Sequence, residues 1–249
     1  MGALRALREL GASFTRADVL VLCYHSVRIR ERFAAQMTAL AERGYSVLSL
    51  RHFTEWLSGA APLRSPAALV TFDGAYRDQL EHAVPVLQSL GFPATFFPVS
   101  CDLDAEEPGM TRSDLLALTA AGHAIGCHTH THPDLTRLSP DELASEVIGS
   151  KRRLEDALGQ RVTAFCYPDG VYDARVVTAV QRAGFDVAFT VDLGGVSRGA
   201  DPYRLPRLPV LGEPRAGEFL AYVRGTRTRS GTILAWWKLR ERLLERRER

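Results

Sequence analysis

The chain has 249 residues, 46% of them hydrophobic and 24% charged, and a formal net charge of +2. This length and composition suit one α/β domain of barrel size with a full core. The positive charge is concentrated at one end: residues 227–249 hold eight basic and three acidic residues, which leaves residues 1–226 with a net charge of −3. A body without excess positive charge argues against nucleic acid as a partner.

The first residues predict a cytoplasmic protein. Arginines are spread over the first 16 residues, and no long apolar segment precedes a cleavage site. No stretch approaches the roughly 20 apolar residues that a membrane span needs. We therefore expect a cytoplasmic location, either free or peripheral to the inner face of the membrane.

Short apolar runs alternate along the chain with longer helical patterns. The expected strands are Val19–His25, Tyr45–Leu50, Ala67–Asp73, Pro93–Ser100, His123–His128, Thr163–Pro168 and Asp186–Val191. The expected helices are Glu31–Arg43, Arg77–Leu90, Arg112–Ala120, Ser139–Leu158 and Asp173–Ala183, several of them followed by the glycine typical of a helix C-terminus. The near-continuous apolar character of the strands predicts a sheet that is covered on both faces. This α/β alternation indicates a parallel (β/α) barrel or a doubly wound sheet.

The four cysteines are far apart and form no CxxC pair. This spacing argues against a zinc ribbon or a thioredoxin-type site. We expect reduced thiols that serve as small buried residues behind a functional site: Cys23, Cys101, Cys127 and Cys166.

Polar residues stand at the carboxyl ends of four predicted strands. These are Tyr24 and His25, then Asp73, then His128, and then Tyr167, Pro168 and Asp169. Ligands and catalytic groups are usually found at this edge of a parallel sheet. Polar residues at four strand ends therefore predict a functional site there. Each residue alone is equally compatible with a helix cap or a buried core position.

The cluster "HTHTHPDL" predicts a metal site. Its histidines, His128, His130 and His132, follow one another at every second position. The outer pair can hold one divalent ion through imidazole nitrogens, even in an irregular turn. A catalytic zinc normally takes three protein ligands, and the cluster alone does not identify the third.

The segments "TFDGAY", "HTHTH" followed by "PDL", "FCYPDGVYD" and "AGFDVAFT" resemble, in that order, the polysaccharide deacetylases of carbohydrate esterase family 4. The resemblance runs from about Leu20 to Leu211. It implies a distorted (β/α) barrel of the polysaccharide deacetylase type. It also implies a divalent metal, zinc first and cobalt or nickel as alternatives. The implied reaction removes N- or O-linked acetyl groups from a glycan or glycolipid. The opening "VLCYHSV" resembles the circularly permuted branch that includes the poly-N-acetylglucosamine deacetylases.

The resemblance also implies roles for individual residues. Asp73 matches the catalytic base, and His25 matches the general acid of the permuted branch. His128 and His132 match the metal-binding histidines, whereas His130 inherits no role. The residues expected to contact substrate are Tyr24, Tyr76, Tyr167, Pro168 and Asp169, with the backbone N–H of Tyr167 expected to bind the oxyanion.

The chain departs from the family pattern where the family has its metal-binding aspartate. Gly74 stands there and offers no side-chain ligand, Ala75 replaces the following glycine, and the third motif lacks an arginine. Three residues remain as candidates for the third ligand: Asp169, Asp73 itself and His130. Restoring the carboxylate by Gly74→Asp is expected to strengthen metal binding.

Two functions follow from these departures. We favour a metal-dependent hydrolase that removes acetyl groups from an N-acetylated or O-acetylated sugar, with an altered metal site. The alternative is a catalytically impaired pseudoenzyme that binds a carbohydrate or a partner on the same barrel.

The chain is expected to divide into a barrel domain, residues 1–226, and a basic amphipathic C-terminal helix, residues 227–249. Trp236 and Trp237 share one face of that helix. Such a helix either lies on an anionic membrane or a partner protein, or packs its tryptophans on the barrel.

Overall fold

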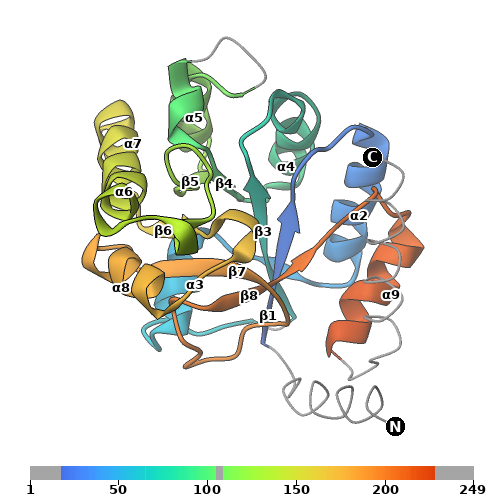
Figure 1. Cartoon of the computed structure of the whole chain (residues 1–249). Helices are drawn as coiled ribbons and strands as arrows, with labels where there is room; N and C mark the ends of the chain where they lie inside the picture. The colour runs from blue at the N-terminus through green and yellow to red at the C-terminus, as the bar shows by residue number, and fades with distance from the viewer. Residues whose placement is uncertain (1–17, 65, 105–108, 228–249) are drawn as a thin grey trace, which may run out of the picture.

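The computed structural model describes residues 18–64, 66–104 and 109–227, and its centre is a parallel sheet (Figure 1). The strands are β1 (Val19–Tyr24), β2 (Ser46–Val47), β3 (Ala67–Asp73), β4 (Thr95–Phe97), β5 (Ala124–Ile125), β6 (Ala164–Cys166), β7 (Val187–Leu193) and β8 (Leu205–Pro209). They pair in parallel in the order β5-β4-β3-β1-β8-β7-β6, with β2 beside β3.

The two edges of this sheet meet just beyond β5. The backbone N–H of Cys127 donates to the carbonyl of Ala164 at 2.9 Å, and that of Cys166 donates to the carbonyl of Cys127 at 2.8 Å. This parallel bridge joins the chain after β5 to β6. The sheet is therefore nearly closed into a barrel, which confirms the barrel prediction over a doubly wound sheet.

Helices surround the sheet (Figure 1). They are α2 (Arg30–Glu42), α3 (Leu50–Leu57), α4 (Val84–Leu90), α5 (Arg112–Ala120), α6 (Pro140–Ala144), α7 (Ser150–Leu158), α8 (Ala174–Arg182) and α9 (Ala216–Arg227). Two π-helical turns lead into helices, η1 (Gln79–Ala83) before α4 and η4 (Ser145–Gly149) between α6 and α7. Single 3₁₀ turns are η2 (Ser100–Asp104), η3 (Leu135–Arg137) and η5 (Pro168–Gly170).

Three elements were missing from the sequence-based expectations: α3, β8 and α9. The strand expected at residues 45–50 is only Ser46–Val47, because Ser49 caps α3 by accepting a hydrogen bond from the N–H of His52. β8 was not predicted, because its sequence "LPRLP" contains prolines and a charged residue, which are unusual in a strand.

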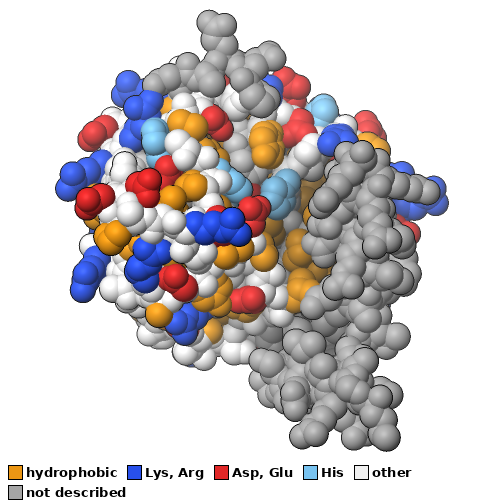
Figure 2. All heavy atoms as spheres, viewed as in Figure 1, with side chains coloured by type: hydrophobic (Ala, Val, Ile, Leu, Met, Phe, Trp, Pro, Cys, Tyr) orange, Lys and Arg blue, Asp and Glu red, His pale blue; other side chains and the backbone are white. Residues whose placement is uncertain are grey.

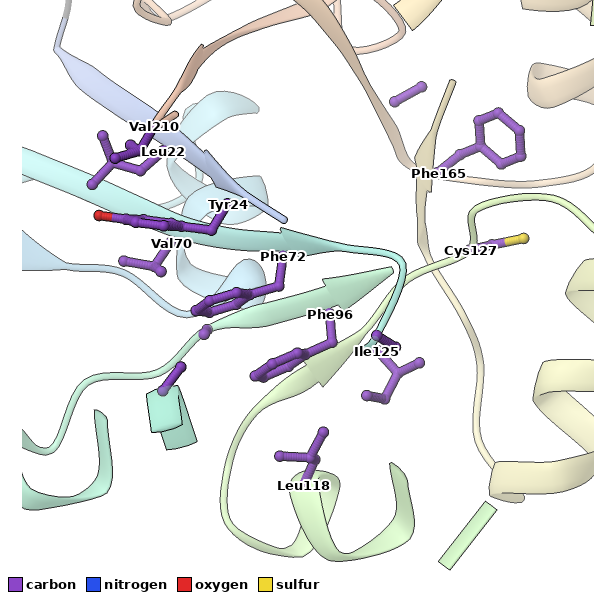
Figure 3. Packing of buried hydrophobic residues seen from close by; sticks show 14 of the residues in the cluster. Leu22, Tyr24, Val70, Phe72, Phe96, Leu118, Ile125, Cys127, Phe165 and Val210 are labelled. Carbon is purple, nitrogen blue, oxygen red and sulfur yellow. The ribbon is translucent and has the colours of Figure 1, made fainter. Parts of the chain in front are cut away.

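The core has two layers, and alternate residues of each strand contribute to one or the other. Inside the barrel lie Val19, Val21, Ala67, Leu69, Phe97, Phe189 and Leu205, with Phe53 and Trp56 of α3 packed against them. Between the sheet and the outer helices lie Leu22, Tyr24, Val70, Phe72, Phe96, Leu115 and Leu118. Figure 3 shows Tyr24, Phe72 and Phe96 on the same side of their strands. The alternation places Asp73 and Arg207 on the inner face.

Among the described residues, no helix is long and apolar enough to cross a membrane. Figure 2 shows acidic and basic side chains interspersed over the face viewed. The predicted C-terminal helix lies outside the described residues from residue 228 onwards.

Phe72→Ala should lower the free energy of unfolding by about 3–5 kcal/mol, because it removes a fully buried ring from a close-packed layer. The Phe72 ring stacks on Phe96 at 4.8 Å and on Tyr24 at 5.5 Å between centroids. Urea unfolding monitored by circular dichroism measures the change. The control is Leu116→Ala on α5, a side chain 39% exposed, which should cost no more than about 0.5 kcal/mol. Equal effects of the two substitutions would contradict this packing.

Candidate functional site

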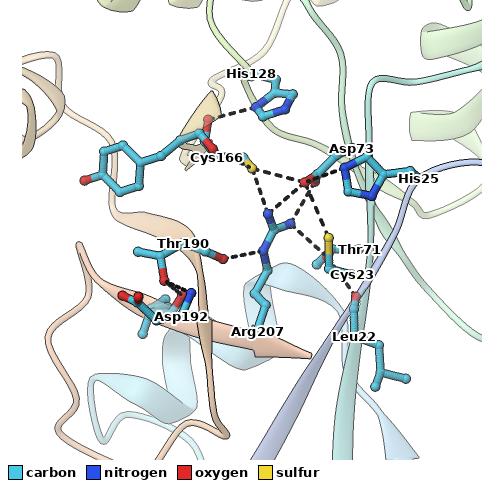
Figure 4. Close-up of polar contacts among 12 residues, drawn as sticks. Leu22, Cys23, His25, Thr71, Asp73, His128, Cys166, Thr190, Asp192 and Arg207 are labelled. Carbon is cyan, nitrogen blue, oxygen red and sulfur yellow. Dashed lines mark hydrogen bonds and ion pairs between the residues drawn. The ribbon is translucent and has the colours of Figure 1, made fainter. Parts of the chain in front are cut away.

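Asp73, the last residue of β3, is paired with Arg207 of β8 inside the barrel (Figure 4). Arg207 Nη1 and Nη2 donate to Asp73 Oδ1 and Oδ2, each at 2.7 Å, and Arg207 Nε donates to the carbonyl of Thr190 at 2.8 Å. Burial alone would raise the pKa of Asp73, but the charge and hydrogen bonds of Arg207 outweigh it and hold that pKa well below its usual range. Asp73 is therefore a carboxylate at neutral pH.

Two cysteines complete the surroundings of this carboxylate. The Sγ atoms of Cys23 and Cys166 each lie 3.4 Å from Asp73 Oδ2. Burial raises the pKa of both thiols, so both are protonated and can donate to the carboxylate. The cysteines of the described residues are free, as expected, but these two contact the site directly instead of lying behind it.

His25 stands beside Asp73 at the mouth of the barrel. Its Nε2 is 3.9 Å from Asp73 Oδ2, and its side chain is 50% exposed. A separation of 3.9 Å leaves no room for an acyl group between the two atoms, because reacting atoms approach only to about 3–3.5 Å. His25 and Asp73 therefore face the pocket from the same side.

His128 and His132 face each other across the same pocket. Their Nε2 atoms are 3.1 Å apart, and Nδ1 of His128 lies 2.9 Å from the carbonyl of Cys166. Since a carbonyl only accepts, Nδ1 of His128 carries the proton and its Nε2 carries a lone pair. Burial lowers the pKa of His128 to about 4, so the ring is neutral at physiological pH.

This pair of imidazoles fits a divalent metal ion. Two nitrogens bound tetrahedrally to zinc at 2.0–2.1 Å are about 3.4 Å apart, close to the spacing observed here. The bond from His128 to Cys166 is the kind of outer contact that orients a metal-binding histidine. The described residues also place an Asp73 oxygen, a His128 nitrogen and Cys166 Sγ within 4.8 Å of one another.

The candidates for a third ligand differ in their positions. His130 is turned away, with Nδ1 2.9 Å from Ser100 Oγ, and it does not line the pocket. Asp169 lines the pocket from the η5 turn, where its φ is +51°. Asp102, which the sequence did not single out, lines it as well. Asp73 also faces the pocket, but Arg207 occupies both of its oxygens.

The ring of Tyr76 occupies the space next to Gly74. A Cβ atom on Gly74 would lie 2.5 Å from Tyr76 Cζ and 2.9 Å from its hydroxyl oxygen. The φ angle of Gly74 is +86°, a conformation that residues with a side chain rarely adopt. The end of the Tyr76 side chain therefore fills the space beside Gly74, an aspartate there would require this ring to move, and we revise the expected effect of Gly74→Asp accordingly.

A pocket of about 380 Å³ brings most of the predicted site residues together. It is lined by His25, Asp73, Gly74, Tyr76, Val99, Cys101, Asp102, His128, Thr131, His132, Tyr167, Asp169 and Val191. Tyr24 is not among them: it points to the outer layer, where its hydroxyl donates to Gln36 Oε1 at 2.8 Å. We therefore no longer assign Tyr24 to substrate contact. Pro168 is buried in the η5 turn and does not line the pocket either.

The oxyanion role expected for Tyr167 also needs correction. Its backbone N–H donates to the carbonyl of Phe189 at 3.1 Å, which continues the pairing of β6 with β7. Its hydroxyl donates to the carbonyl of Tyr203 at 3.0 Å. The N–H of Tyr167 is thus already used and does not face an oxyanion.

Residues 60–188 match the family model described as polysaccharide deacetylase. The chain is 28% identical over 214 residues to YxkH of Bacillus subtilis (strain 168), covering 83% of this chain and 76% of that protein. It is 22% identical over 247 residues to the poly-beta-1,6-N-acetyl-D-glucosamine N-deacetylase of Escherichia coli (strain K12), but it spans only 36% of that protein. The fold resembles the Streptococcus pyogenes deacetylase PplD, with a TM-score of 0.78, 23% identity, and coverage of 83% of this chain and 98% of that one.

Arg207→Met should lower the free energy of unfolding at pH 7 by about 3–5 kcal/mol, because it leaves the Asp73 charge buried without a partner. Arg207→Met/Asp73→Asn should recover most of this loss. The folded-state pKa of Asp73 is lowered, so the pair contributes stability above about pH 4 and loses it as the pH falls further. The difference between wild type and Arg207→Met should therefore shrink as the pH falls below about 4. Urea unfolding across this range provides the test, and a difference that does not depend on pH would rule out the ion pair as its origin.

Gly74→Asp alone should not strengthen zinc binding and should lower the free energy of unfolding by about 1–3 kcal/mol, the usual cost of a strained backbone conformation. Gly74→Asp/Tyr76→Ala should recover part of the stability, because it removes the collision with the Tyr76 ring. Gly74→Ala serves as the control without a carboxylate. Zinc competition titrations and urea unfolding on the four proteins measure both effects. Tighter zinc binding by Gly74→Asp without loss of stability would show that Tyr76 does not block the position.

Proposed function

We propose, because the chain belongs to the polysaccharide deacetylase family, that it removes acetyl groups from an N-acetylated or O-acetylated sugar or glycan. One observation carries the proposal: His25, Asp73, His128 and His132 come from three different strand ends and line one pocket. His25 and Asp73 can transfer protons, and the two imidazoles beside them can hold a metal ion. Metal-assisted amide hydrolysis requires both.

Asp73 and His25 are the residues proposed to transfer protons. Asp73 is held as an anion by Arg207, and at 3% side-chain exposure it is almost shielded from solvent. His25 is half-exposed beside it and can reach a substrate in the pocket. We assign to His25 Nε2 the delivery of the proton to the leaving nitrogen, with Asp73 as the adjacent base.

His128 and His132 are the residues that would hold a divalent ion. Imidazole nitrogens suit zinc, and cobalt and nickel are the alternatives. When bound, the ion would supply a Lewis acid and an activated water. Asp102 and Asp169 are the carboxylates of the pocket that remain free of Arg207 and could complete the ligand set.

The proposed substrate is an acetylated sugar unit of a glycan. The pocket volume of about 380 Å³ is at the lower end of small-molecule sites. Tyr76 and Val191, 39% and 40% exposed, present apolar surface to its contents. A glycolipid that carries the same acetamido group would offer the same reacting atoms.

Acetate release from N-acetylglucosamine oligomers tests this function directly. Turnover should fall when the protein is treated with a chelator and return when zinc is added. The matched control is His128→Ala/His132→Ala, which should bind neither zinc nor cobalt tightly and should release no acetate. A wild-type protein that binds these oligomers without releasing acetate would favour the pseudoenzyme instead.

His25→Ala should lower turnover on N-acetyl substrates by roughly 10²–10⁴-fold while leaving substrate affinity nearly unchanged, because it removes a positioned proton donor. The loss should be smaller on O-acetyl substrates, whose leaving alcohol needs a proton less than an amine does. His52→Ala, an exposed histidine of α3 outside the pocket, is the control. Steady-state kinetics on both substrate types measure the effect. Unchanged N-deacetylation in folded His25→Ala protein would remove this residue from the mechanism.

A further inference from the structure

The carboxylate of Glu146 holds the middle of the loop that carries His128 and His132. The loop also accepts hydrogen bonds at the carbonyls of Thr129 and His130 from the backbone N–H groups of Ser100 and Cys101, both at 3.0 Å. Glu146 Oε2 accepts hydrogen bonds from the backbone N–H groups of His130 at 2.8 Å and Thr131 at 2.9 Å. Glu146 Oε1 accepts a third from the hydroxyl of Thr131 at 2.6 Å. These contacts lie midway between the two metal-binding candidates in the sequence.

The loop adopts a backbone conformation that needs such support. Thr129 has a φ of +68° and His132 a φ of +59°. Positive φ values are uncommon for residues other than glycine, and a β-branched threonine is rarely found there. Within the loop, the N–H of His132 donates to Thr129 Oγ1 at 3.0 Å. Contacts to Glu146 are therefore expected to stabilise an arrangement that the sequence does not favour locally.

Glu146 is placed by an irregularity in its helix. It lies in the π-helical turn η4, between α6 and α7. A π turn inside an α-helix adds a residue to the turn, and such turns are frequent at functional sites. The same region contacts the start of the loop, since Ser150 Oγ is 3.1 Å from Sγ of Cys127, the residue before His128.

The two histidines depend on the loop to different degrees. His128 is oriented by its hydrogen bond to the carbonyl of Cys166 on β6. His132 follows Thr131 directly in the chain, and its Nε2 lies 3.1 Å from that of His128. A shift of residues 130 and 131 would therefore move His132 relative to His128.

We propose that Glu146 is a positioning residue for the metal site: by holding His130 and Thr131 it sets the separation of the His128 and His132 nitrogens. This inference rests on the proposed function, because it assumes that these two histidines bind the ion. Glu146 lies outside the pocket lining and acts through the loop. Its role is geometric, so an uncharged side chain of the same shape should replace it.

The test compares Glu146→Ala with Glu146→Gln. Glu146→Ala should weaken zinc and cobalt binding about 10–100-fold, the usual effect of losing an outer contact to a metal ligand. Glu146→Gln should stay near wild type, because its amide oxygen can accept from both backbone N–H groups while its NH₂ donates to Thr131 Oγ1. Competition titrations with a chromogenic chelator give the affinities. Hydrogen exchange of the His130 and Thr131 amides in metal-free protein gives a second readout, which should accelerate only in Glu146→Ala.

Glu142→Ala on the same helix is the matched control. Glu142 accepts hydrogen bonds from the N–H and hydroxyl of Ser139 at 2.9 and 2.7 Å. Its replacement by alanine therefore removes a helix-capping contact but no contact to the loop that carries His128 and His132. It should leave metal affinity unchanged. If Glu146→Ala does not fold, Glu146→Asp, shorter by one methylene, provides the same comparison.

Two outcomes separate this inference from the proposed function. Unchanged metal affinity in Glu146→Ala, with normal binding by wild type, would overturn the positioning role alone. Failure of the wild-type protein to bind zinc or cobalt would overturn the metal site, and the positioning role with it.

Discussion

The ion pair between Asp73 and Arg207 is the interaction on which the site depends. It joins β3 to β8 across β1, inside a barrel whose other inward residues are mostly apolar. Either charge alone would be costly there, because a buried ion loses its hydration without compensation. Together they keep a carboxylate ionised at the carboxyl ends of the strands, within 4 Å of His25 Nε2 and beside two protonated thiols.

Gly74 affects the charge of this site, because it offers no side-chain carboxylate. The motif that "TFDGAY" resembles has two adjacent carboxylates, whereas this chain has one, and Arg207 already neutralises it. Tyr76 covers Gly74 with a phenol. Burial, followed by the nearby Asp102 and Asp73, raises the pKa of that phenol and keeps it neutral. A divalent ion between His128 and His132 would thus meet less negative charge, unless Asp102 or Asp169 contributes it.

The two halves of the proposed site are built in different ways. The acid–base half, His25 and Asp73, lies at the ends of β1 and β3, which pair with each other. The imidazole half lies on a loop with strained residues, and the helix that contains Glu146 supports that loop from outside. The position of His25 and Asp73 therefore depends on strand pairing, whereas the position of His128 and His132 depends on contacts to the loop from a neighbouring helix.

Local patterns in the sequence determined the alternation of strands and helices, and the grouping of His25, Asp73, His128 and Asp169 at one edge. These features follow from periodicity and from the position of a residue at a strand end, which depend only on near neighbours in the chain. Tyr24 was misassigned because successive strand residues face opposite sides, and the sequence does not show which side is the barrel interior.

Only the tertiary structure decided the partners of these residues. Arg207 is 134 residues from Asp73, so no motif links the two. Its strand, β8, was not predicted because it contains prolines. The pairing of β6 with β7 uses the N–H of Tyr167, which donates to the carbonyl of Phe189. Long-range contacts of this kind depend on how the strands are ordered around the barrel, which the spacing of residues along the chain does not encode.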